Sequence, residues 1–149
     1  MRIVGFLFFL LLLGGFALVA LKGRQVAEDG LADATFADHL NSHWRAIALP
    51  DVTLADESPP VLRFGDAGEL SGDSGCNFYS GSYTLDDTGF TVGALRATRK
   101  ACSEPLMNQE RAFFDALSAA RKVEFSDRRL RLLDADDEPR AEFERYEPD

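Results

Sequence analysis

Two histidines four positions apart are the residues of this chain that most resemble a metal site. On a helix, His39 and His43 would share one face, with Asp38 beside the first, and two imidazoles at that spacing can hold a zinc ion. No third ligand stands at a motif spacing, and no glutamate forms an H-E-x-x-H arrangement. We therefore expect surface or interface histidines, with no metal and no cofactor. The alternative is a metal-dependent or hydrolytic envelope enzyme that uses His39 and His43.

A second group of reactive residue types is formed by Asp73, Ser74 and Cys76. A cysteine held in a disulfide has no thiolate with which to attack a substrate. The acidic turns at 86–87 and 134–138 lack the spacing of a calcium-binding loop. The chain also has neither a G-x-x-x-x-G-K-[ST] nor a G-x-S-x-G motif. The sequence therefore predicts no catalytic residue and no metal ligand.

An uncharged apolar stretch, Ile3–Leu21, opens the chain between Arg2 and Lys22. As a helix it would span roughly 28 Å, which is close to the thickness of a bilayer core. It is longer than the apolar core of a cleaved signal, and cutting after Ala20 would put Leu18 where a small residue is preferred. We predict an uncleaved signal anchor over residues 1–22 in the bacterial inner membrane. Secretion after signal cleavage is the alternative.

The remainder of the chain is acidic. The formal net charge is −9, and all acidic residues follow position 27. This balance argues against nucleic acid as a partner, because nucleic-acid binding requires basic patches. The acidic residues and both cysteines lie on the same side of the apolar stretch, so we expect this part to face the periplasm.

Two cysteines, Cys76 and Cys102, are an even number in a compartment that we expect to be oxidising. A bond between them would close a loop worth about 3–4 kcal/mol on the chain-entropy model. We predict this disulfide, and two buried free thiols are the alternative.

Short strands with turn signals between them dominate residues 40–147, which we predict to be one domain after a linker at 23–39. A single helix is expected at 104–119, with Ser103 as its N-cap and Pro105 in its first turn. Its apolar stripe is interrupted once, by Glu110. The fold class is therefore α+β: an N-terminal transmembrane helix, then an antiparallel β-sheet or partly closed barrel with one packed α-helix. Strands are expected at 44–49, 61–64, 69–71, 78–85, 90–92, 94–98, 123–125, 130–133 and 140–146.

Four blocks of this sequence resemble, in order, those of the META/HslJ-like domain family. Residues 71–83 read SGDSGCNFYSGSY, which is similar to the S-G-x-x-G-C-N-x-x-x-G-x-Y signature. The stretch TRKAC at 98–102 is similar to T-x-x-A-C, and the helix is similar to E-x-x-F-x-x-x-L. Besides the two cysteines, the residues that carry the resemblance are Gly72, Gly75, Asn77, Gly81, Tyr83, Thr98 and Glu110.

The resemblance implies a small α+β domain of bacterial envelope proteins, linked to heat shock or to novobiocin resistance, and it implies no enzymatic activity. We therefore expect a membrane-anchored, extracytoplasmic, non-enzymatic module that serves envelope stress or drug resistance. Its expected partners are the membrane, through Ile3–Leu21, and an unknown protein or small apolar ligand. An apolar ligand could enter a barrel mouth lined by Phe78, Tyr79 and Tyr83, although these rings are more simply read as core.

Overall fold

Strands make up most of the chain that the structure, a computed structural model, describes: residues 36–126 and 128–148. Residues from His39 onward form one compact unit. The predicted signal anchor at 1–22 and residues 23–35 of the predicted linker lie outside the described residues. Within the described ranges, no helix has the length and apolar character needed to cross a membrane.

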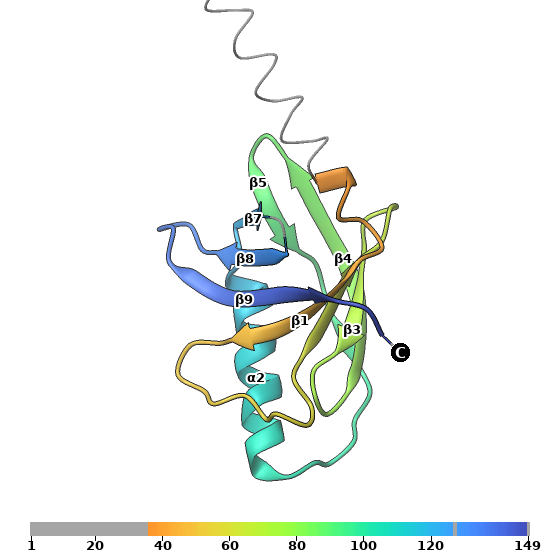
Figure 1. The fold of residues 1–149 in the computed structure, drawn as a ribbon, viewed down its shortest axis with the longest axis vertical. Coiled ribbons are helices and arrows are strands. Elements are labelled where there is room, and N and C mark those ends of the chain that lie inside the picture. Colours follow the sequence, from red (N-terminus) through yellow and green to blue (C-terminus); the bar gives the residue numbers. More distant parts are fainter. Residues whose placement is uncertain (1–35, 127, 149) are drawn as a thin grey trace, which may run out of the picture. The chain divides into compact units, whose positions relative to one another are not determined.

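The sheet is antiparallel throughout and runs in the order β5-β4-β3-β2-β1-β9-β8-β7, with β6 beside β4 (Figure 1). This confirms the α+β class; of the two forms predicted for the strands, the open sheet is the one observed. The strands are β1 His43–Ala48, β2 Val61–Phe64, β3 Glu69–Asp73, β4 Phe78–Asp86, β5 Gly89–Val92, β6 Arg96–Ala97, β7 Lys122–Ser126, β8 Arg129–Leu133 and β9 Pro139–Tyr146.

The sheet curls until its two ends meet at one point. The amide of Phe90 in β5 donates a hydrogen bond of 2.7 Å to the carbonyl of Arg121, the residue before β7. Gly89 permits this approach, because its φ is +127° and a Cβ there would lie 2.7 Å from the Arg121 carbonyl oxygen. The strand order nevertheless stays open, since no ladder pairs β5 with β7 in the described residues.

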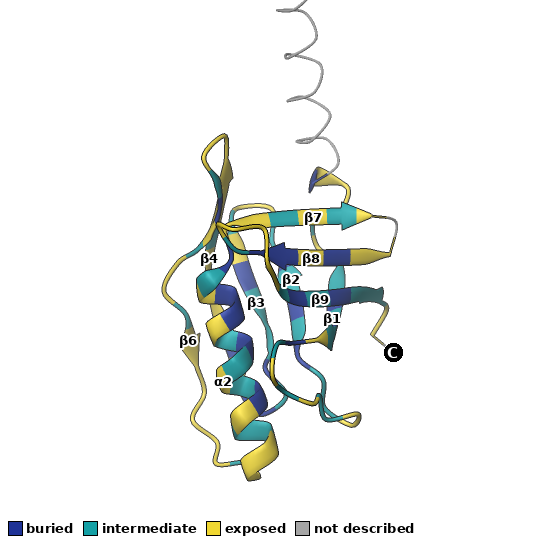
Figure 2. Ribbon diagram, turned by 90° about the vertical axis from the view of Figure 1, so that its left-hand side faces the viewer, coloured by how far each residue is buried: buried dark blue, intermediate teal, exposed yellow. Residues whose placement is uncertain are grey.

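The helix α2, Glu104–Ala119, has the predicted bounds. It packs against β9, β8 and β5, and Figure 2 shows its buried side toward the strands. Ser103 is the N-cap residue, as predicted, although its hydroxyl makes no capping hydrogen bond. Pro105 explains the missing capping bond in part, because proline removes one of the early amides to which a capping side chain bonds.

The core fills the space between the sheet and α2. Alternate residues of β1, β2 and β8 point into it, as the two-residue period of a strand requires. Aromatic rings and leucines share the core, and the rings meet mostly edge to face; Phe64, for example, lies 5.2 Å from Tyr83 and 6.0 Å from Phe90. The largest fully buried side chains are Trp44, Phe64, Phe90, Phe113, Phe143, Leu62, Leu70, Leu117, Leu130 and Leu132.

We predict that Phe64→Ala lowers the free energy of unfolding by about 3–5 kcal/mol, because the change empties a fully buried site. Urea unfolding followed by the fluorescence of Trp44, the single tryptophan, measures the loss. Phe78→Ala is the matched control. That ring is 59% exposed, so its removal should cost about 1 kcal/mol or less. Equal losses in the two variants would contradict this account of the core.

Candidate functional site

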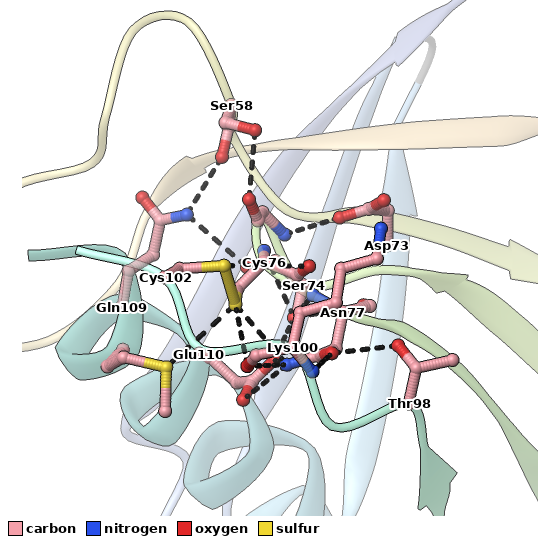
Figure 3. Close-up of a disulfide and its surroundings, with 12 residues drawn as sticks. Ser58, Asp73, Ser74, Cys76, Asn77, Thr98, Lys100, Cys102, Gln109 and Glu110 are labelled. Carbon is pink, nitrogen blue, oxygen red and sulfur yellow. Dashed lines mark hydrogen bonds between the residues drawn. A yellow bond between two sulfur atoms is a disulfide. The ribbon is translucent and has the colours of Figure 1, made fainter. Parts of the chain in front are cut away.

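The disulfide lies beside Asn77, Thr98 and Glu110, three of the residues that carry the family resemblance (Figure 3). The structure pairs Cys76 with Cys102, as predicted, with the two Cα atoms 6.0 Å apart and 26 positions between them in sequence. Cys76 belongs to the turn between β3 and β4, and Cys102 lies just before α2. The bond therefore holds the glycine-rich turn against the start of the helix.

The side chain of Asn77 is the most highly connected group at this site. Its Oδ1 accepts hydrogen bonds from the Thr98 hydroxyl, at 2.8 Å, and from the Lys100 amide, at 2.7 Å. Its Nδ2 donates to the Glu110 carboxylate oxygens, at 3.0 and 3.2 Å, and to the Lys100 carbonyl, at 3.4 Å. Both lone pairs and both protons of this buried amide are thus used.

Glu110 enters the same network from α2. Besides the bonds from Asn77, its carboxylate accepts a hydrogen bond from the hydroxyl of Ser74. The Ser74 hydroxyl oxygen in turn accepts a hydrogen bond of 3.0 Å from the backbone amide of Asn77. The charge that interrupts the apolar stripe of the helix is therefore explained, since it supplies the acceptor that the turn between β3 and β4 requires.

Gln109 is the residue of this site that sequence reasoning missed. It is fully buried; its Oε1 accepts the Ala55 amide at 2.8 Å, and its Nε2 donates to the carbonyls of Ser58, at 2.8 Å, and Ser74, at 3.3 Å. The loop between β1 and β2 is thereby tied to the helix. One signal was available, because Gln109 lies four positions before Phe113 and so falls on the buried face.

Two glycines of the motif are required by close packing at this site. Gly75 has φ +94°, and a Cβ there would lie 2.2 Å from Nε2 of Gln109. A Cβ on Gly72 would lie 1.9 Å from the carbonyl oxygen of Val61 on the neighbouring strand. Side chains at either position would force the loop or the strand away.

The three rings that could have lined a barrel mouth do not share one opening. Tyr79 is buried among Phe113 and Phe114, and its hydroxyl donates to the Val61 carbonyl at 2.9 Å. The hydroxyl of Tyr83 donates to the Gly65 carbonyl at 2.8 Å. Phe78 is exposed, because adjacent residues of a strand point to opposite faces. The preferred reading of these rings as core therefore holds for Tyr79 but is wrong for Phe78, which is 59% exposed.

The two histidines also lie apart from any shared helix. His39 belongs to the turn that precedes β1, whereas His43 is the first residue of that strand. The His39 ring stacks on Phe125, with centroids 4.4 Å apart, and its Nδ1 lies 2.6 Å from Nη2 of Arg145. His43 instead meets Tyr146 edge to face. The helical i, i+4 arrangement required for a two-histidine ligand set is therefore not formed.

The remaining polar candidates serve the backbone. Asp73 Oδ1 accepts the Gly75 amide at 2.7 Å, and Asp134 Oδ1 accepts the amides of Asp136, at 2.9 Å, and Glu138, at 3.0 Å. Within residues 36–126 and 128–148, no group of three or more histidine, cysteine or acidic side chains is arranged to hold a metal ion.

Comparison with known proteins assigns the family. Residues 34–147 match the model of the META domain, so the chain belongs to the META domain family. A search among curated proteins finds no match.

Solved structures show the same fold. An NMR structure of a protein from Burkholderia xenovorans is 26% identical, with a TM-score of 0.63 over 77% of this chain and 88% of that one. A crystal structure of a DUF4847 family protein from Bacteroides vulgatus is 13% identical, with a TM-score of 0.54 over 74% of this chain and 96% of that one. The latter likeness concerns the fold alone.

Together, these contacts make the motif region a clasp, by which we mean the disulfide with Ser74, Asn77, Gln109 and Glu110. The clasp joins the turn between β3 and β4, the loop between β1 and β2, the segment before α2, and α2 itself. Its polar groups bond to one another rather than to an open surface, which suits the region to holding the fold together.

We predict that Glu110→Ala lowers the free energy of unfolding by about 2–3 kcal/mol, because it removes the charged acceptor shared by the Asn77 side-chain amide and the Ser74 hydroxyl. The two donors keep only the neutral carbonyls of Lys100 and Asn77 as acceptors. Adding Asn77→Ala to that variant should cost less than Asn77→Ala costs alone, since the two residues share their bonds. Urea unfolding of the four proteins of this cycle gives the coupling energy. Glu104→Ala, at an exposed position in the first helical turn, is the control. Additive losses would contradict a shared network.

Burial raises the pKa of the Tyr79 phenol well above its ordinary value, and the nearby Asp73 carboxylate adds to the shift. The neutral phenol is therefore favoured in the folded state, and its contribution to stability is complete below the unfolded pKa of about 10. We predict that the wild-type chain loses stability as the pH rises above about 10, and that Tyr79→Phe loses less over the same range. Urea unfolding at a series of alkaline pH values tests this, with Tyr146→Phe as the control for removing a phenol. The same alkaline slope in the wild-type and Tyr79→Phe chains would disprove it.

Proposed function

We propose that this META domain protein is a non-enzymatic binding module of the bacterial cell envelope, anchored in the inner membrane with its domain in the periplasm. In this role it would support resistance to envelope stress or to drugs. Membership of the META domain family supports a small domain of the extracytoplasmic type.

The observation that carries the proposal is the disulfide at the centre of the clasp. Structural disulfides persist in oxidising compartments and are rare in the cytosol, where thiols are kept reduced. Cys76 and Cys102 are joined beside the Asn77 network, so an oxidising compartment would complete the same part of the fold that the motif residues stabilise.

The non-enzymatic part of the proposal is supported by how the motif residues are used. Ser74, Asn77 and Glu110 bond to one another, and Cys76 has no free thiol. A nucleophile must be reachable by its substrate and activated by a base. Ser74 and Cys76 do not meet this condition, because the Ser74 hydroxyl is hydrogen-bonded within the clasp and Cys76 is in a disulfide.

The anchoring part rests on the sequence. Ile3–Leu21 carries no charge, and its length as a helix would match a bilayer core. The acidic surface of the domain favours a position away from anionic lipid headgroups, since like charges repel.

We predict that the full chain expressed in bacterial cells is recovered in the inner-membrane fraction with its cysteines oxidised. Mass spectrometry of acid-trapped, unreduced digests should show one peptide pair joined through Cys76 and Cys102. Recovery as dissolved cytosolic protein with both thiols open to alkylation would overturn the proposal.

A matched variant reports the side of the membrane directly. Cys76→Ser leaves a single thiol at Cys102, and a membrane-impermeant maleimide should label that thiol in intact spheroplasts. The wild-type chain, with its disulfide formed, is the unlabelled control. Labelling of Cys76→Ser only after the spheroplasts are lysed would place the domain in the cytosol and contradict the proposal.

A further inference from the structure

A hollow of about 410 Å³ lies where α2, the loop after β1 and the start of β9 come together. It is separate from the clasp, and its size is within the range of small-molecule sites. Figure 2 shows α2 and β9, which contribute lining residues, and β1, whose following loop supplies residues 50–52. Its lining combines charged groups with a small apolar part that includes Val52, Ala112 and Ala116.

The hollow holds charges of both signs. Arg111 and Arg140 line it, together with Asp51 and Asp115. Within the described residues, no ion pair of 4.0 Å or less joins either arginine to either aspartate. This holds even for Arg111 and Asp115, which are four positions apart on α2, a spacing at which opposite charges commonly pair.

The two arginines are weakly engaged. Nη1 of Arg111 donates to the Asn108 amide oxygen at 3.0 Å. Nη1 of Arg140 lies 4.0 Å from an oxygen of Asp134, and its buried Nε has no partner. On the outer face of the sheet, by contrast, Arg45 lies 2.6 Å from Glu144. Guanidinium groups normally gain most from planar, bidentate contacts with carboxylates, which the hollow leaves open.

The walls of the hollow are fixed in place. Asp51 has φ +58° in a tight turn that an isolated bridge between Leu49 and Val52 closes. The loop continues to Ala55, whose amide is bonded to Gln109 on α2. The loop after β1 and the helix α2, which form two walls of the hollow, are therefore joined by a hydrogen bond. A site built in this way loses little conformational freedom when a ligand binds.

From these observations we propose that the hollow binds a small zwitterion: an amino acid or a short peptide with a free amino end and a free carboxyl end. The carboxylate would bind Arg111 and Arg140, the ammonium group would bind Asp51 and Asp115, and a small apolar side chain would contact the alanines of α2. Such a ligand would bridge the arginines and the aspartates of the hollow, which form no ion pair with one another, and would offer Arg140 a closer carboxylate than that of Asp134. The inference rests on the proposed binding role and does not depend on the membrane anchor.

Saturation-transfer NMR on the full chain in nanodiscs tests the proposal, with empty nanodiscs as the blank. The probes are alanyl-alanine, its N-acetylated form and its C-amidated form. We expect alanyl-alanine to bind and each blocked form to bind roughly tenfold or more weakly, because each has lost one charge-assisted contact. No measurable binding of alanyl-alanine, or equal binding of all three probes, would overturn the proposal.

Variants assign the two ends of the ligand. Arg140→Gln should weaken alanyl-alanine binding roughly tenfold but leave the weak binding of the C-amidated probe unchanged. Asp115→Asn should also weaken alanyl-alanine binding roughly tenfold, and it should leave the weak binding of the N-acetylated probe unchanged. Arg99→Gln and Asp87→Asn, outside the hollow, are the matched controls. Equal weakening by the controls would overturn the site, and unchanged Trp44 emission shows that each variant is folded.

This experiment and the localisation experiment fail independently. Loss of zwitterion binding leaves the membrane fraction and the disulfide unaffected. Recovery of the chain from the cytosol, in turn, would not alter a titration carried out on purified protein.

Discussion

The structure depends on one buried amide, that of Asn77. It bonds at once to the segment before α2, through Thr98 and Lys100, and to the helix, through Glu110. A buried amide left without partners would cost about 1–3 kcal/mol for each unmet group. The amide therefore joins three parts of the chain: its own turn between β3 and β4, the segment before α2, and α2. The disulfide links the first two of these parts, because Cys76 lies in the turn and Cys102 in the segment before α2. The glycines of the motif follow from the same constraint, since Gly75 leaves room for the Gln109 side chain that secures the adjacent loop.

The arrangement also separates the roles of the two sides of α2. The side that carries Gln109, Glu110 and Phe113 is used for the clasp and the core. Asn108, Arg111 and Asp115 belong to the rim of the hollow. A change in the ligand-facing residues can thus occur without disturbing the contacts that hold the fold. This separation suits a fold that solved structures share at low sequence identity.

Much of the fold could be predicted because local signals agreed with the final packing. Pro105 and the apolar spacing set the bounds of α2, and turn residues between alternating segments marked most strands. The closure of the clasp could not be predicted in detail, because it depends on contacts between residues far apart in sequence, such as Ala55 with Gln109. The placement of the histidines could not be predicted for a related reason: the spacing of His39 and His43 suits a helix, but a turn and a strand separate their rings. The charged hollow also escaped sequence reasoning, since its lining comes from three distant segments.

The bond between Phe90 and Arg121 has a consequence for encounters between copies of the chain. Exposed edge strands of antiparallel sheets are templates for aggregation, since their unpaired amides can pair with a strand of a neighbouring copy. Here one amide of the edge strand β5 already bonds to the chain's own backbone, and the turn of the adjacent β4–β5 hairpin carries Asp86 and Asp87. Their negative charges repel an approaching acidic copy at the point where strand exchange would begin. The curl of the sheet thus withdraws one edge amide from pairing with a second copy, in addition to closing the core.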